Sequence, residues 1–236
     1  MPVPQTATVR VRVLRWSLLA VAGLGLAWFA EDLVALRHRV SPKRFGVVEA
    51  GEVYRSGQIA GHLIEGVLRD RQIGLVVDLT DDAPVDPREL ADQQAERAAI
   101  ARLGIERRQH VLIADGTGDV VTYAAAVRSV VEGVRTGKPV LVHCAAGTQR
   151  TGGVIALYRL LVQHQPADEV LREMQYYKYN YDMSPQLLDY LNDNLPALAE
   201  ELVRTGAIDQ VPNPLPRLGA GPQIARDHTP DSPATR

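Results

Sequence analysis

The chain's only cysteine, Cys144, lies between a short apolar run and a loop of small residues. In order, this segment reads Val140-Leu-Val-His143-Cys144-Ala-Ala-Gly-Thr-Gln-Arg150-Thr151-Gly-Gly153. A cysteine thiolate is a strong nucleophile, and a guanidinium such as that of Arg150 binds an oxyanion through two parallel hydrogen bonds. These residue types at this spacing predict a site that binds a phosphate-like anion and attacks it.

The loop after Cys144 has the composition of an anion-binding loop. Its interior residues are Ala145, Ala146, Gly147, Thr148 and Gln149. We expect their backbone N–H groups to surround the oxygens of the anion, and Gly147 to allow a turn that a Cβ would oppose. Thr151 is expected to donate a hydrogen bond to the sulfur, and the thiol should be ionised at neutral pH.

A helix is predicted over Gly152–His164, directly after this loop, because apolar residues recur at helical spacing. These residues are Val154, Ile155, Leu157, Leu160 and Leu161. The positive end of the helix dipole would then point back at the loop and at Cys144. The segment therefore predicts a strand, a loop and a helix in succession.

The segment resembles the signature of cysteine-dependent protein tyrosine and dual-specificity phosphatases, which is His-Cys, five residues, Arg, and then Ser or Thr. The resemblance implies that Cys144 forms a cysteinyl-phosphate, that Arg150 binds the phosphoryl oxygens and that His143 braces the loop. Such a mechanism needs no metal ion or organic cofactor. Two alternatives are a buried free cysteine in a core strand and a rhodanese-like sulfurtransferase, which also places a cysteine in an anion-binding loop.

A phosphatase of this kind also needs an acid that protonates the leaving oxygen. The loop Ala114–Asp119 holds two candidates, Asp115 and Asp119. Asp119 directly precedes a predicted helix, Val120–Arg135, and as its N-cap it would stay ionised and donate protons poorly. We therefore predict that Asp115 is the general acid, since its Asp-Gly pair resembles the acid loop of bacterial family members. The alternative is that Asp115 only forms a turn.

Strands alternate with helices through the middle of the chain, which predicts an α/β fold with a central, mainly parallel sheet flanked by helices. The expected strands are Phe45–Ala50, Glu52–Tyr54, Ile73–Leu79, Ile105–Ile113 and the run into Cys144. The expected helices are Leu63–Gln72, Pro87–Leu103, Val120–Arg135, Gly152–His164, Glu169–Tyr177 and one that starts at Pro185 and ends at Gly206. We expect residues 45–206 to form this catalytic domain and residues 207–236 to be a disordered, proline-rich tail.

Residues 1–44 are expected to target or anchor the protein. Three arginines precede an uncharged run from Trp16 to Ala30. This run is shorter than the roughly 20 apolar residues of a full span, and we favour an uncleaved single-pass membrane anchor over a secretory signal sequence. A buried helix of the core is a third alternative. The basic start favours a catalytic domain on the non-cytoplasmic side, although basic residues also follow the run.

Three further features of the sequence have two interpretations each. The segment Val53–Gln58 resembles the first motif of bacterial and plant-like dual-specificity phosphatases, which lies beside the phosphate loop, and its Arg55 would form either a structural ion pair or a charged pocket wall. The tyrosine-rich segment Tyr176–Tyr181 would be an aromatic rim for a substrate or packing between helices. Asp78 and Asp81, near the end of a strand, are interpreted as turn and capping residues rather than site residues.

The composition limits the possible functions. The chain has 236 residues, 46% of them hydrophobic, and a net charge of −2, so we expect one core and no nucleic acid partner. A single cysteine excludes an internal disulfide and a cysteine-rich metal site.

We therefore predict a phosphomonoester hydrolase that acts on a phosphorylated protein or on a phospholipid headgroup. The loop interior contains no lysine or extra arginine, whereas members of the family it resembles that act on multiply phosphorylated inositol lipids tend to have basic residues there. The resemblance therefore implies a singly charged headgroup or a phosphoprotein rather than a polyphosphoinositide. A second hypothesis is a catalytically inactive phosphate-binding module that recruits phosphorylated partners to a membrane.

Overall fold

The computed structural model describes residues 40–219 except residues 82, 83 and 85. The expected anchor, with its uncharged run at 16–30, lies outside the described residues. In the part of the chain that is described, no helix has the length and apolar character needed to cross a membrane. The compact unit to which nearly all described residues belong begins at Pro42.

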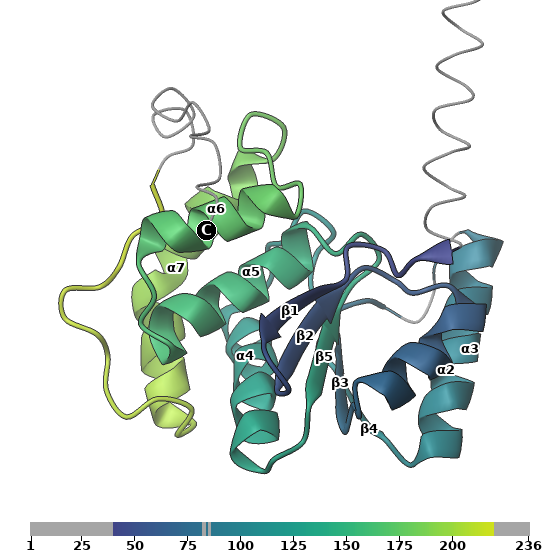
Figure 1. Cartoon of the computed structure of the whole chain (residues 1–236). Coiled ribbons are helices and arrows are strands. Elements are labelled where there is room, and N and C mark those ends of the chain that lie inside the picture. Colours follow the sequence, from purple (N-terminus) through teal and green to yellow (C-terminus); the bar gives the residue numbers. More distant parts are fainter. Residues whose placement is uncertain (1–39, 82–83, 85, 220–236) are drawn as a thin grey trace, which may run out of the picture. The chain divides into compact units, whose positions relative to one another are not determined.

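The described residues contain one five-stranded sheet with the order β1-β2-β5-β3-β4. The strands are β1 (Gly46–Glu49), β2 (Val53–Ser56), β3 (Leu75–Asp78), β4 (Glu106–Gln109) and β5 (Val140–His143). β1 pairs with β2 antiparallel, and all other pairings are parallel. The prediction of a mainly parallel sheet is confirmed, and β5, which leads into Cys144, is the central strand (Figure 1).

Helices cover both faces of the sheet, as the sequence predicts (Figure 1). One layer consists of α2 (Gly61–Asp70) and α3 (Pro87–Leu103); the other consists of α4 (Val120–Arg135), α5 (Gln149–Leu157), α6 (Ala167–Tyr176) and α7 (Pro185–Arg204). β5 contributes to both cores because successive strand residues face opposite sides. Leu141 packs in the α2–α3 core, whereas Val140 and Val142 pack in the core on the other face.

Capping residues set the ends of α3 and α4 where the sequence predicts them. The side chain of Asp86 accepts a hydrogen bond from Arg88 N, and Gly104 ends α3 in the left-handed conformation, with φ of 66°. The side chain of Asp119 accepts a hydrogen bond from Thr122 N at the start of α4. These aspartates satisfy backbone N–H groups that have no partner within the helix.

The helix after the phosphate loop differs from the prediction. It begins at Gln149 rather than at Gly152, because Gly152 N already donates to Thr148 O at 2.9 Å. A π-helical segment, Tyr158–Val162, continues it. Arg150 and Thr151 therefore lie in the first turn of α5, where their side chains are held by the helix rather than by a loop.

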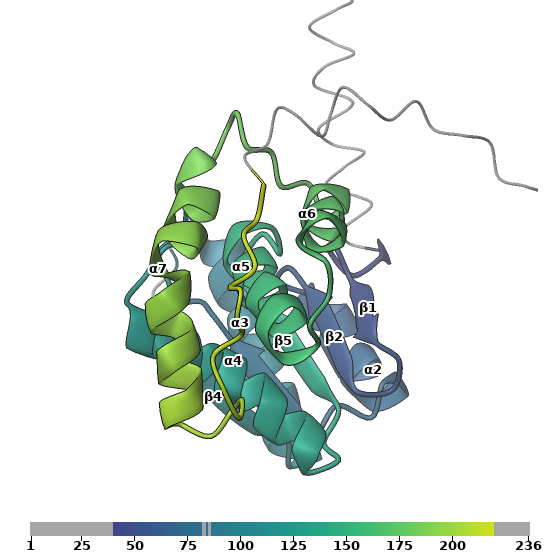
Figure 2. The same cartoon turned by 90° about the vertical axis from the view of Figure 1, so that its left-hand side faces the viewer.

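The predicted boundary of the disordered tail at residue 207 is wrong. Ala207, Ile208 and Leu218 are buried in the core. Asn192 on α7 holds the segment in place, since its side chain donates to Leu218 O and accepts from Leu218 N, each at 3.0 Å. A few apolar side chains and this amide pair are enough to pack a proline-rich segment along α7 (Figure 2). Residues 220–236 lie outside the described residues.

Candidate active site

Cys144 lies at the carboxyl end of β5, between the central strand and the N-terminus of α5. Ligand sites of parallel sheets lie at this edge of the sheet. The Cys144 thiol is 1% exposed, and Gly147 N donates to its sulfur at 3.1 Å. Burial by itself raises the pKa of the thiol, but the charge of Arg150 and the hydrogen bonds from Thr151 and Gly147 outweigh it and lower the pKa. The site therefore favours the nucleophilic thiolate.

Two glycines bring the phosphate loop against the end of β2. Gly147 has φ of +76°, and a Cβ on it would lie 2.4 Å from Gly57 N. A Cβ on Gly57 would lie 2.7 Å from Ala146 O. Gln58 N also donates to Ala145 O at 3.1 Å. The prediction that Val53–Gln58 lies beside the phosphate loop is confirmed.

Arg55 supports the phosphate loop rather than forming a pocket wall. It is fully buried, and its Nη2 donates to Gly147 O at 3.0 Å. Its guanidinium lies 3.8 Å from the centroid of the Tyr177 ring. Burial lowers the pKa of Arg55 to about 10, although the nearby charge of Glu173 raises it. Of the two interpretations of Arg55, a structural role agrees with these contacts, but its partners are a carbonyl oxygen and an aromatic ring rather than the expected ion-pair partner.

The tyrosine-rich segment 176–181 has no single role. Tyr177 stacks with Arg55, and Tyr179 is buried and donates to Ser184 O at 3.1 Å, so both pack within the fold. Tyr176 is 76% exposed. The packing interpretation agrees with Tyr177 and Tyr179, and Tyr177 links the end of α6 to the phosphate loop through Arg55.

His143 belongs to a buried network of charges beneath the phosphate loop. Its Nε2 lies 3.0 Å from Glu96 Oε1 and 3.8 Å from Asp78 Oδ1. Burial lowers the pKa of the imidazole, but the two carboxylates outweigh it and raise the pKa to about 9. The imidazolium form is therefore favoured directly before Cys144, consistent with a bracing role.

Sequence reasoning missed two members of this network. The turn interpretation of Asp78 is correct as far as it goes, since Thr80 N and Thr80 Oγ1 donate to its carboxylate at 2.9 and 2.7 Å. The same carboxylate also lies 2.6 Å from Arg107. Glu96 is held by Gln58, whose Nε2 donates to Glu96 Oε2 at 3.1 Å. Because these partners already occupy the carboxylate oxygens, the Asp78, Glu96 and His143 cluster is an ion-pair network rather than a metal site.

The raised pKa of His143 predicts how stability depends on pH. The folded protein binds a proton up to about pH 9, whereas the unfolded chain releases it near 6.5. The contribution of His143 is therefore full below pH 6.5 and is lost as the pH rises through 9, by roughly 3 kcal/mol. We expect Glu96→Gln to lower stability at pH 6 and to make the decline between pH 6.5 and 9 shallower in urea unfolding.

Glu65→Gln is the matched control for this experiment. Glu65 on α2 is also an ion-paired carboxylate, 2.6 Å from Arg102, but its side chain is 35% exposed, whereas that of Glu96 is 3% exposed. The free energy of unfolding of Glu65→Gln, plotted against pH, should run parallel to that of the wild-type protein over this pH range. A Glu96→Gln curve that is also parallel to wild type would contradict the network.

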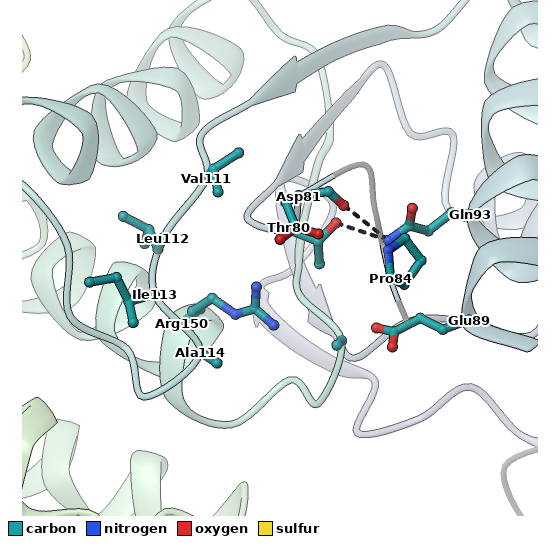
Figure 3. A pocket seen from close by; sticks show the side chains of 11 residues that line it. Thr80, Asp81, Pro84, Glu89, Gln93, Val111, Leu112, Ile113, Ala114 and Arg150 are labelled. Carbon is teal, nitrogen blue, oxygen red and sulfur yellow. Dashed lines mark hydrogen bonds between the residues drawn. The ribbon is translucent and has the colours of Figure 1, made fainter. Parts of the chain in front are cut away.

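A cavity of about 530 Å³ lies over the phosphate loop (Figure 3). It is lined by Thr80, Asp81, Pro84, Glu89, Gln93, Val111, Leu112, Ile113, Ala114, Ala145 and Arg150. The guanidinium of Arg150 points into the cavity, and its Nη1 donates to Leu79 O at 3.2 Å. One wall is apolar, formed by the segment Val111–Ala114, so the cavity fits a phosphate that carries an apolar or aromatic group.

The loop that carries Asp115 lies against the phosphate loop. Gly116 has φ of +93°, and a Cβ on it would lie 3.0 Å from Gln149 Cβ. Asp115 is exposed, and its Oδ1 accepts hydrogen bonds from Thr117 N and Thr117 Oγ1 at 2.9 and 2.8 Å. Asp115 thus forms the turn that the alternative describes, and this turn borders the cavity through Ala114.

Asp119 lies in the same loop but is held differently. Its side chain caps α4, and the hydrogen bonds from Thr122 lower the pKa of its carboxyl. The prediction that Asp119 is the helix N-cap is confirmed. An ionised cap is a poor proton donor, so Asp115 remains the predicted acid of this loop.

The predicted start of the domain at residue 45 is too late, because Lys43 and Arg44 contact the active site. Lys43 O accepts a hydrogen bond from Gly57 N at 2.7 Å, and Arg44 Nη1 donates to Ala146 O at 2.7 Å. Sequence analysis assigned these residues to the linker, since Ser-Pro-Lys-Arg has no apolar pattern. The only signal was the pair of basic residues next to the first strand.

A buried, activated cysteine among N–H groups at the start of a helix defines a nucleophilic site for an oxyanion. The model of the tyrosine phosphatase family matches residues 39–175, more than half of the chain. The chain belongs to this family and is a cysteine-dependent phosphatase. No curated protein matches the chain.

Several solved structures share the fold. TpbA of P. aeruginosa in complex with phosphotyrosine has a TM-score of 0.53 and 22% identity, over 69% of this chain and 98% of that one. The catalytic core of the PP-IP phosphatase SIW14 from S. cerevisiae has a TM-score of 0.53 and 17% identity, over 72% of this chain and 96% of that one. PTPMT1 has a TM-score of 0.51 and 17% identity, over 69% of this chain and 98% of that one. One of these structures holds phosphotyrosine and another is named as a PP-IP phosphatase, so the shared fold does not identify the substrate of this chain.

Proposed function

We propose that the protein hydrolyses phosphate monoesters through a cysteinyl-phosphate intermediate and without a metal ion. The observation that carries the proposal is the sulfur of Cys144, which accepts from Gly147 N and has a lowered pKa next to Arg150. Neither an inert core cysteine nor a passive phosphate-binding module needs an activated thiol, because the N–H groups and the arginine alone bind the anion.

The reaction has two steps. The thiolate of Cys144 attacks phosphorus in line, and the bond from phosphorus to the leaving oxygen breaks as Asp115 donates its proton to that oxygen. Arg150 and the loop N–H groups hold the three equatorial oxygens. Water then attacks the cysteinyl-phosphate and gives a proton to Asp115, the sulfur–phosphorus bond breaks, and inorganic phosphate leaves the free thiolate behind.

The proposed substrate is a phosphorylated protein, with phosphotyrosine as the preferred residue. The apolar wall Val111–Ala114 supports this choice, because it offers a surface for an aromatic ring beside Arg150. A panel of phosphotyrosine peptide, phosphoserine peptide, phospholipid and small phosphate esters, assayed with a chelator and with vanadate, tests the proposal. Faster hydrolysis of the phospholipid than of every peptide would reassign the substrate to a lipid headgroup.

We also propose that the N-terminal segment anchors the protein in a membrane, with the catalytic domain on the non-cytoplasmic side. The support is the uncharged run Trp16–Ala30 after three arginines. The full-length protein should sediment with membranes, and protein without residues 1–41 should be soluble and active, because the catalytic unit begins at Pro42. Protease added outside intact cells should remove the catalytic domain. Full-length protein found wholly in the soluble fraction would contradict both the anchor and the signal-sequence alternative.

A further inference from the structure

The segment Pro42–Arg44 is held against the phosphate loop by its own hydrogen bonds. Gly57 N donates to Lys43 O, and Arg44 donates to Ala146 O, each at 2.7 Å. Arg44 has φ of 48°, a conformation that residues other than glycine rarely adopt. Such conformations persist where the surrounding structure holds them, often at functional sites. The contacts thus fix two basic residues beside the loop that binds the phosphate.

The two basic side chains are placed differently. Arg44 is committed to the carbonyl oxygen of Ala146. The stem of Lys43 runs along Gly57, since its Cδ lies 3.0 Å from where a Cβ on Gly57 would be, and that Cβ would lie 2.7 Å from Ala146 O. Within the described residues, the Lys43 ammonium forms no ion pair.

The charge of Lys43 lies beside the phosphate loop, because its stem packs along Gly57. Lys43 is half-buried, and burial lowers the pKa of its ammonium, as does the charge of Arg44. The negative charges of Glu89 and Cys144 raise this pKa. Glu89 lines the cavity over the phosphate loop (Figure 3). A half-buried cation without an ion pair at this place is suited to an anionic ligand.

We propose that Lys43 forms a second anion subsite beside the phosphate loop, which takes a phosphate or carboxylate group that the substrate carries close to the scissile phosphate. This inference rests on the proposed phosphatase function and narrows its substrate class. It replaces the expectation of a singly charged group, which considered only the loop interior. The positive charge that the interior of the phosphate loop lacks is supplied by Lys43, about 100 residues before the loop in the sequence.

Matched aryl esters test the subsite. The measured quantity is the ratio of kcat/KM for phenyl diphosphate, or for 3-carboxyphenyl phosphate, to kcat/KM for phenyl phosphate in the same protein. Because each variant supplies its own reference, partial unfolding cancels from the ratio. Lys43→Met should lower this ratio about two- to fivefold, as expected for losing one partly exposed charge pair. Lys43→Arg should keep most of the ratio, and Glu89→Gln should raise it by removing a competing negative charge.

Lys138→Met is the control for removing a lysine elsewhere. Lys138 lies 2.8 Å from Glu106, near the start of β5 and away from Cys144, so its ratio should equal that of the wild-type protein. In Lys43→Met, a lower kcat/KM ratio for phenyl diphosphate alone would identify the second group as phosphate. A lower ratio for 3-carboxyphenyl phosphate alone would identify it as a carboxylate. Equal ratios in wild type and Lys43→Met for both esters would overturn the subsite.

A binding experiment tests the subsite independently of the proposed reaction. In the Cys144→Ser background, calorimetry measures the affinity for phenyl diphosphate relative to phenyl phosphate without turnover. Adding Lys43→Met should reduce the relative affinity about two- to fivefold. If the wild-type protein hydrolyses no ester but this binding preference depends on Lys43, the proposed reaction fails and the subsite stands. If hydrolysis depends on Cys144 but neither preference depends on Lys43, the subsite fails and the reaction stands.

Discussion

Cys144→Ser is expected to lower kcat for phosphate esters by about 10⁴ or more, because a hydroxyl in place of the thiolate leaves no activated nucleophile. Binding of phosphate esters should persist, since the N–H groups of the loop and Arg150 hold the oxygens. Stopped assays with high enzyme concentration and calorimetry with phenyl phosphate measure the two effects separately.

Chemical modification of the wild-type protein provides a second readout for the same residue. A lowered pKa predicts that iodoacetate alkylates Cys144 below pH 8.5, the range in which an ordinary thiol reacts slowly, and that inorganic phosphate protects it. Since the chain has one cysteine, any loss of activity on alkylation is due to this residue. Wild-type hydrolysis rates in Cys144→Ser would exclude the cysteinyl-phosphate mechanism.

Asp115→Asn is expected to lower kcat by about 10² to 10⁴ on alkyl phosphates, because proton donation to a poor leaving group is worth that much. The effect should be smaller on aryl esters whose leaving groups need little protonation. The variant should also lose the basic limb of the pH profile, which reports the ionisation of the general acid. Rates over a series of esters with different leaving groups, measured from pH 4 to 9, test this assignment.

Asp119→Asn is the matched control, since it changes a second aspartate of the same loop. Asn is also a good helix cap, so the helix α4 should persist, and activity should change little. The two assignments exchange if Asp119→Asn shows the large loss and Asp115→Asn does not. Similar rates in both variants and in the wild-type protein would mean that neither carboxyl donates the proton.

Local chemistry explains which parts of the structure could be predicted from the sequence. The Asp86 and Asp119 caps and the Gly104 stop act within one helical turn, so α3 and α4 follow from neighbouring residues. The apolar run into Cys144 predicted a strand, because the strands of a parallel sheet are buried on both faces and carry such runs. The phosphate loop followed from residue types within eight positions.

The missed features depend on contacts between distant segments. Glu96 lies on a helix with many charged residues, and nothing in its local pattern distinguishes the carboxylate that pairs with His143 from its exposed neighbours. Lys43 and Arg44 looked like part of a linker because their partners, Gly57 and Ala146, lie elsewhere in the sequence. The packing of Leu218 on Asn192 was likewise invisible in a segment with few apolar residues. Each of these features requires the tertiary structure.

The separation of these contacts along the chain has a consequence for how the enzyme matures. The Arg44–Ala146 and Arg55–Gly147 hydrogen bonds join residues 102 and 92 positions apart. Because closing such long loops costs conformational entropy, we expect these two contacts to form only after β2 has docked beside β5. In the unfolded chain Cys144 is an ordinary thiol with a pKa near 8.5, because Arg150, Thr151 and Gly147 lower this pKa only from their folded positions. The Cys144 thiol of the nascent chain is therefore weakly nucleophilic during synthesis and any translocation, and it becomes reactive only when the fold is complete.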